Sequence, residues 1–147
     1  MHVFRSMIID TEIDRVWAAV RAFDGVAHWN PGVLSATLEN GGSTATGSIR
    51  RLDIADGTVF RETLLAHSDV DRSYTYDIVE SALPVTHYVS THRLVPITHT
   101  GQTLGIWESR FTCAADDAAE MEKIVGDAIY IGAMSGLNTF LKENNNG

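Results

Sequence analysis

The residues best suited to chemistry lie near the middle of the chain, in a stretch of alternating side chains. Glu62 alternates with Phe60 and Leu64, so on a strand all three share one face. A carboxyl group among apolar side chains has a raised pKa, because burial disfavours its charged form, and it could act as a general acid or base. The alternative is a structural glutamate that pairs with Arg50, Arg61 or another arginine.

A second group of candidate residues has polar atoms at the ends of otherwise apolar side chains. They lie on two predicted strands, which a short connection before Pro84 would pair. Such side chains suit a ligand that is mostly apolar and carries a few oxygens, although they could equally fill a core. The histidine among them could titrate near neutral pH or serve as a structural side chain. These candidates are Tyr76, Tyr88, Ser90 and His92, and Ile78, on the same strand face as Tyr76, is a further predicted ligand contact.

The last stretch of the chain, Asp116 to Asn144, predicts one long helix with a stripe of small residues. Ala128, Gly132 and Gly136 are four apart and would stack on one face of an α-helix. Each glycine inside a helix costs about 1 kcal/mol relative to alanine, so the stripe indicates a need for space. That space is either a cavity under the helix or a close approach of another backbone.

Motifs for metal, nucleotide or covalent chemistry are absent from the sequence. The six histidines show no HxH or HExxH spacing, and the single cysteine, Cys113, can form neither an internal disulfide nor a thiolate metal site. There is no GxSxG, Walker or dinucleotide-binding fingerprint. We therefore predict no metal and no cofactor.

Composition and charge restrict the class of protein. A formal charge of −8 argues against nucleic acid as a partner, because binding it requires a basic surface. No signal-peptide pattern is evident at the start and no apolar run approaches the roughly 20 residues of a membrane span, so we expect a cytoplasmic protein without membrane insertion. A homodimer is one possibility that the sequence does not decide.

The order of predicted elements indicates an α+β domain. A first strand (2–9) precedes a helix with apolar residues at 13, 16, 17 and 20 and a short second helical turn (26–29). Strands follow at 33–39, 47–54, 58–69, 73–80, 85–97 and 101–113, and Asp56-Gly57 marks a tight hairpin between two of them. We expect one domain over residues 1–147, with a curved antiparallel sheet around the last helix and a loose tail at 144–147.

Several residues, in this order and spacing, resemble the SRPBCC (START-like, birch-pollen-allergen-like) superfamily and its bacterial polyketide cyclase/dehydrase-like branch. The resemblance covers nearly the whole chain. It implies a helix-grip fold, in which a seven-stranded sheet holds the C-terminal helix around a deep apolar cavity. The matching residues are Val16, Trp17, Phe23, Trp29, Pro31, Gly47, Ile49, Arg50, Gly57, Glu62, Tyr74, Tyr76, Pro84, Tyr88, Ser90, Trp107 and Phe111.

This resemblance implies a protein that binds a small hydrophobic or aromatic molecule, such as a lipid, polyketide or isoprenoid. The alternative is a polyketide cyclase or dehydratase that uses Glu62 with Tyr88 or His92 as acid and base. The plant abscisic acid receptors are similar and have a pocket glutamate at the position of Glu62. Their pocket lysine falls at Ala55, so a carboxylate ligand would lack its counter-charge here.

The orientation of one aromatic residue is left open by the sequence. Trp107 and Glu108 are neighbours on a predicted strand, so they point to opposite faces. The family pattern favours Trp107 in the cavity wall, whereas the abscisic acid receptors have an acid at Glu108. We include Trp107 among the predicted ligand contacts.

Overall fold

A computed structural model describes residues 1–144 of the chain, and of the predicted tail at 144–147 only Asn144 lies within the described residues. Seven strands form one antiparallel sheet in the order β1-β7-β6-β5-β4-β3-β2. The strands are β1 (His2–Ile9), β2 (Val33–Leu38), β3 (Ile49–Ile54), β4 (Val59–Ser68), β5 (Ser73–Glu80), β6 (Thr86–Ile97) and β7 (Gln102–Thr112).

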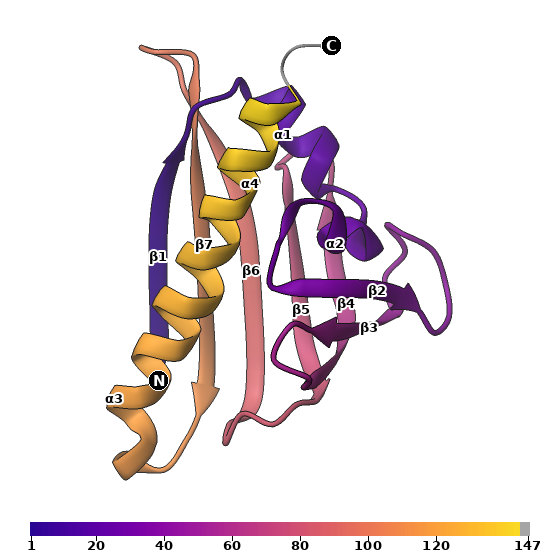
Figure 1. Cartoon of the computed structure of the whole chain (residues 1–147), viewed down its shortest axis with the longest axis vertical. Helices are drawn as coiled ribbons and strands as arrows, with labels where there is room; N and C mark the ends of the chain where they lie inside the picture. Colours follow the sequence, from indigo (N-terminus) through magenta and orange to yellow (C-terminus); the bar gives the residue numbers. More distant parts are fainter. Residues whose placement is uncertain (145–147) are drawn as a thin grey trace.

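Helices cover one face of this sheet. Two short helices follow β1, and a continuous helical segment of 29 residues, Ala115–Glu143, ends the described chain. Figure 1 shows this last segment crossing in front of β1, β7 and β6, with α2 beside β2. The helices are α1 (Ile13–Val20), η1 (Phe23–Gly25), α2 (Val26–Trp29), η2 (Ala115–Asp117), α3 (Ala118–Lys123), η3 (Ile124–Ile131) and α4 (Gly132–Glu143). The predicted α+β helix-grip architecture is confirmed.

The alternation of side chains along the central strands produces the buried face of the sheet. Tyr74 and Tyr76 of β5 are buried, as are Tyr88, Ser90 and His92 of β6, while the residues between them are more exposed. Period-two alternation of this kind places one face of each strand against the helices and the other toward solvent. The polar side chains singled out in the sequence therefore face the interior.

Local signals in the sequence account for the turns and the first helix. The β3–β4 hairpin turns at Gly57, which has a φ of +91°, a conformation that favours glycine. Helix α1 buries Val16, Trp17 and Val20 on one side, as the spacing predicts. Its cap is Glu12, whose carboxylate accepts hydrogen bonds from two backbone amides of the first turn.

The middle of the C-terminal helix is a π-helix, a feature that the sequence analysis did not anticipate. Segment η3 has hydrogen bonds to the fifth residue back, and the amide of Gly132 accordingly donates to the carbonyl of Asp127. Arg5 of β1 holds this segment through two carboxylates five residues apart, with distances of 2.9 Å to Glu122 and 3.0 Å to Asp127. The wider turn suits this bridge, because residues five apart then lie on the same side.

The expectation that Ala128, Gly132 and Gly136 all border one cavity is corrected by the structure. Ala128 lies in the π-helical segment η3 and borders a different hollow from Gly132 and Gly136, which lie in α4. Gly136 lies against the loop after α2, where an added Cβ would be 2.5 Å from Cδ of Pro31. Gly136 therefore permits close packing, the alternative noted from the sequence, while an added Cβ at Gly132 would meet its nearest atom at 3.7 Å.

The C-terminal helical segment is, by length and composition alone, long and apolar enough to cross a membrane. Core helices of soluble proteins pass the same test, and the apolar side of this one packs against the sheet. Its fully buried side chains include Val125, Tyr130, Met134 and Leu137. We therefore describe it as the core helix of a soluble fold.

The two helix glycines make a matched test of this packing. We expect Gly136→Ala to lower the free energy of unfolding by about 1–3 kcal/mol, because its methyl group would overlap Pro31 and lie 3.1 Å from the carbonyl oxygen of Trp29. Gly132→Ala is expected to raise it by up to about 1 kcal/mol, because alanine favours the helix and finds space. Urea unfolding of the two variants measures both values, and equal effects would contradict the assigned packing.

Candidate ligand-binding site

A cavity of about 340 Å³ lies between the concave face of the sheet and the C-terminal helix. Its volume is within the range of small-molecule sites in proteins. Strands β3, β4, β5, β6 and β7, the loop after α2 and segment η3 all contribute to its wall. The lining residues are Val26, Asn30, Gly32, Val33, Arg50, Leu52, Ile54, Asp56, Thr58, Phe60, Glu62, Tyr76, Ile78, Ala82, Leu83, Tyr88, Trp107, Ile124, Ala128, Ile129 and Ala133.

The cavity brings together most of the residues singled out from the sequence. Aromatic and aliphatic side chains dominate its wall, and Glu62, Arg50 and two tyrosines supply polar groups. Trp107 faces inward, while its neighbour Glu108 points outward and bonds to His2 at 2.8 Å. The predicted ligand contacts that line the cavity are Phe60, Glu62, Tyr76, Ile78, Tyr88, Trp107 and Ala128.

Four predicted ligand contacts do not line this cavity. Ser90 and His92 lie on the same face of β6 as Tyr88 but farther into the core, behind Trp107. Gly132 and Gly136, both in α4, line a separate hollow between α2 and α4. Of the stripe, only Ala128 borders the cavity.

The polar centre of the cavity is a buried ion pair. Nε of Arg50 donates to Oε1 of Glu62 at 2.9 Å, and Nη2 of Arg50 lies at the same distance from that oxygen. The two side chains are only 2% and 6% exposed. Nη1 of Arg50 also donates to the carbonyl oxygen of Phe23 at 2.7 Å, and the guanidinium lies 3.9 Å from the centre of the Phe23 ring. The ion pair therefore connects β3 and β4 to the segment after α1.

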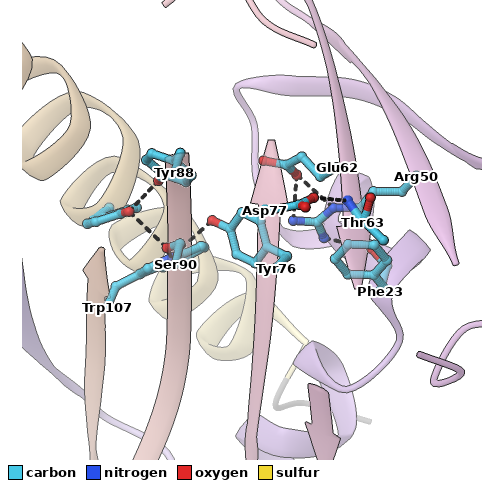
Figure 2. Close-up of polar contacts among 10 residues, drawn as sticks. Phe23, Arg50, Glu62, Thr63, Tyr76, Asp77, Tyr88, Ser90 and Trp107 are labelled. Carbon is cyan, nitrogen blue, oxygen red and sulfur yellow. Dashed lines mark hydrogen bonds and ion pairs between the residues drawn. The ribbon is translucent and has the colours of Figure 1, made fainter. Parts of the chain in front are cut away.

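The carboxylate of Glu62 is only half used by this pair. Both contacts to Arg50 fall on Oε1, and within residues 1–144 no hydrogen bond reaches Oε2. Figure 2 shows Oε2 directed away from Arg50. Burial raises the pKa of the Glu62 carboxyl above its usual range, and the Arg50 charge opposes that rise. The site thus offers one carboxylate oxygen to a ligand.

A chain of hydroxyl groups forms the opposite side of the site. The hydroxyl of Tyr130 bonds to those of Tyr88 and Ser90, the latter at 2.8 Å. Nε1 of Trp107 donates to Ser90 at 3.0 Å and to the hydroxyl of Tyr76 at 3.1 Å (Figure 2). Because Tyr76 accepts this bond and has no acceptor of its own among residues 1–144, its proton can be donated into the cavity.

Backbone irregularities lie beside both polar sides of the cavity. The pairing of β4 with β5 shifts register between Arg61 and Glu62, and the pairing of β6 with β7 shifts between Thr86 and Val89. Next to the second shift, His87 has a φ of +55°. Such bulges bend a strand and redirect side chains, which here are Glu62 and Tyr88.

His92 lies within a stack of rings. Its ring is parallel to that of Trp107 at a centroid distance of 4.0 Å, and the far side of Trp107 stacks on Tyr130 at 5.1 Å. Within the described residues, neither ring nitrogen has a hydrogen-bond partner. Burial, aided by the charge of Arg50, lowers the pKa of His92 to about 3. The imidazole is therefore neutral and has no direct access to the cavity.

Two important residues received little weight in the sequence analysis. Arg50 appeared there as an alternative partner of Glu62 and as a family match but not as a site residue, although its alternation with Leu52 and Ile54 on one strand would have placed it on the cavity face. Tyr130 of the C-terminal helix is the other residue. No sequence signal marks its hydroxyl as the link between Tyr88 and Ser90.

Metal binding finds no support in the described residues. Across residues 1–144, no three histidine, cysteine, aspartate or glutamate side chains come together as a metal site would require. The chemistry available in the cavity is hydrogen bonding and proton transfer by Glu62, Tyr76 and Tyr88.

Residues 1–138 match the family described as polyketide cyclase/dehydrase and lipid transport. The chain belongs to this family, and through it to the SRPBCC superfamily. No curated protein sequence shows significant similarity to the chain. In this family member, the cavity lies between the sheet and the C-terminal helix, and its polar groups include those of Arg50, Glu62, Tyr76 and Tyr88.

Several solved structures of bacterial proteins are similar to this family member. The protein XoxI from Bacillus cereus is 27% identical, with a TM-score of 0.87 and 99% of each chain covered. An uncharacterised protein from Bacillus thuringiensis is 31% identical, with a TM-score of 0.86 over 96% of this chain and 99% of that one. A protein from Nitrosospira multiformis is 27% identical, with a TM-score of 0.82 and 99% of each chain covered.

The buried neutral His92 predicts a pH dependence of stability. Its pKa is about 3 in the folded chain and 6.5 without the fold, so between these values the unfolded chain binds the extra proton. Its contribution therefore lowers stability as the pH falls from about 6.5 toward 3, by up to about 1.4 kcal/mol per pH unit. We expect His92→Phe, which keeps a ring in the stack, to remove this part of the slope.

Urea unfolding across this pH range, with exposed His99→Gln as the matched control, measures the slope. The control should retain the slope of the natural chain. A slope that is unchanged in His92→Phe would show that His92 is not buried in its neutral form.

Proposed function

We propose that this protein binds one small, largely apolar molecule, aromatic or lipid-like, in the cavity between the sheet and the C-terminal helix. The observation that carries the proposal is the composition of the 340 Å³ cavity, in which an aromatic and aliphatic wall surrounds a few convergent polar groups. Ligand sites in proteins have this composition, because apolar surface provides affinity and polar groups fix orientation. The family description, which includes lipid transport, supports it.

The mouth of the cavity is the place to test this function. Ala128 borders the cavity and is exposed, so a large side chain there would obstruct access without filling the core. We expect Ala128→Phe to reduce ligand uptake by tenfold or more and to change stability little, because exposed helix positions tolerate substitution. Native mass spectrometry of freshly purified protein, which detects a co-purified molecule, measures uptake.

The matched control is Ala119→Phe, an exposed position on the same helical segment that does not line the cavity. It should retain the bound molecule. Equal occupancy in both variants would place the ligand elsewhere, and a natural protein that carries and accepts no small apolar molecule would overturn the proposed function.

A polyketide cyclase or dehydratase activity is a second candidate, favoured by one observation. Glu62 and Tyr88 line the same cavity, where Oε2 of Glu62 would accept a proton from a carbon between two carbonyl groups and Tyr88 would donate a hydrogen bond to the resulting enolate oxygen. Burial raises the pKa of Tyr88 well above its usual range, so it acts as a donor. His92 lies behind Trp107 and has no part in this scheme. Turnover that survives both Glu62→Gln and Tyr88→Phe would eliminate it.

The proposed location and partners of the protein follow from its sequence. The charge of −8 makes nucleic acid an unfavourable partner, and a cytoplasmic location fits a soluble fold with one cysteine. We treat residues 1–147 as one ligand-binding domain.

A further inference from the structure

The charges around the cavity restrict what it can hold. Its lining includes one cation, Arg50, and two carboxylates, Glu62 and Asp56. The charge of Arg50 is matched by Glu62, and Asp56 lies exposed at the rim, where it accepts two hydrogen bonds from Thr58. An anionic ligand would therefore lose its hydration without gaining a free cation, which is unfavourable in an apolar site.

A cationic ligand is also poorly matched. The carboxylate of Glu62 is already neutralised by a guanidinium 2.9 Å away, so an ammonium group placed on Oε2 would lie close to a like charge. Both charges would be enclosed in a site whose polar atoms are few. A neutral ligand avoids this cost.

The free hydrogen-bonding groups then specify the polarity of that neutral ligand. Oε2 of Glu62 is an acceptor without a partner in residues 1–144, so it requires a donor. The hydroxyl of Tyr76, which accepts from Trp107, offers its proton to an acceptor. A hydroxyl group on an aromatic ring could meet Glu62, and its apolar body would contact Phe60 and the other rings of the wall.

From this geometry we infer that the cavity selects an uncharged aromatic alcohol, whose hydroxyl group donates to Oε2 of Glu62, over carboxylates, amines and ligands without a donor. This inference rests on the proposed function, because it specifies the class of ligand for the same cavity. It adds that Glu62 recognises the ligand by accepting a hydrogen bond from its hydroxyl group.

Four naphthalene probes of similar shape test this selectivity. They are 2-naphthol, 2-methoxynaphthalene, 2-naphthoate and 2-naphthylmethylammonium, and equilibrium dialysis at neutral pH gives each dissociation constant. We expect 2-naphthol to bind at least about tenfold more tightly than the other three, since a hydrogen bond to a charged acceptor is worth about that factor.

Two glutamine variants locate the selectivity. In Glu62→Gln the amide oxygen would keep the bond to Arg50 and the amide N–H groups would face the cavity, so the preference for 2-naphthol over 2-methoxynaphthalene should fall to about equality or reverse. Glu80→Gln is the matched control, because Glu80 is exposed and outside the cavity lining, and it should keep the natural ratio. If Glu62→Gln does not fold, the probe series on the natural chain decides alone.

The outcomes separate this inference from the proposed function. Equal binding of 2-methoxynaphthalene, or tighter binding of the carboxylate or amine, overturns the selection of alcohols while the cavity remains a binding site. If no probe binds, the selection of aromatic alcohols is overturned. If binding is unaffected by Ala128→Phe, or if the natural protein carries and accepts no small apolar molecule, the proposed function fails and the inference fails with it.

Discussion

The buried ion pair between Arg50 and Glu62 is the interaction on which both the fold and the cavity depend. Two charges in an apolar interior are costly unless they are paired and hydrogen-bonded. Here the guanidinium contacts one oxygen of the carboxylate, the carbonyl of Phe23 and the face of the Phe23 ring at once. The pair thereby joins strands β3 and β4 to the segment after α1. Because it uses one carboxylate oxygen, the other remains available to a guest.

The C-terminal helix borders this cavity without filling it. Its π-helical segment presents small and aliphatic side chains to the cavity, namely Ile124, Ala128 and Ile129, while Tyr130 reaches the hydroxyl chain. Segments of this kind are uncommon and occur frequently at functional sites. Arg5 ties the same segment to β1 through Glu122 and Asp127. The helix is therefore fixed over the sheet at the place where the interior is left open.

The sequence predicted the elements well because hydrophobic periodicity and turn residues are local signals. The alternation through Tyr74 and Tyr76, and the hairpin glycine at Gly57, needed no tertiary information. The same alternation brought Glu62 to a cavity wall. The sequence showed neither the π-helix nor its contacts with Arg5, which is 117 and 122 positions away, and it did not show that Gly132 and Gly136 border a different hollow from Ala128. The orientation of Trp107 likewise depends on packing, which the sequence does not show. Arg50 was not predicted as a site residue because arginine is rarely buried.

The unfolding free energies of a double-mutant cycle on Arg50 and Glu62 test the central claim most directly. If the pair supports the fold, Arg50→Met alone should cost about 3–5 kcal/mol, because it leaves a buried carboxylate unpaired. The combined Arg50→Met and Glu62→Leu variant should recover most of that loss, so the two sites would show a coupling energy of at least about 1 kcal/mol. Additive effects, or a single variant as stable as the natural chain, would contradict the account by showing that the two charges are not enclosed together in the interior.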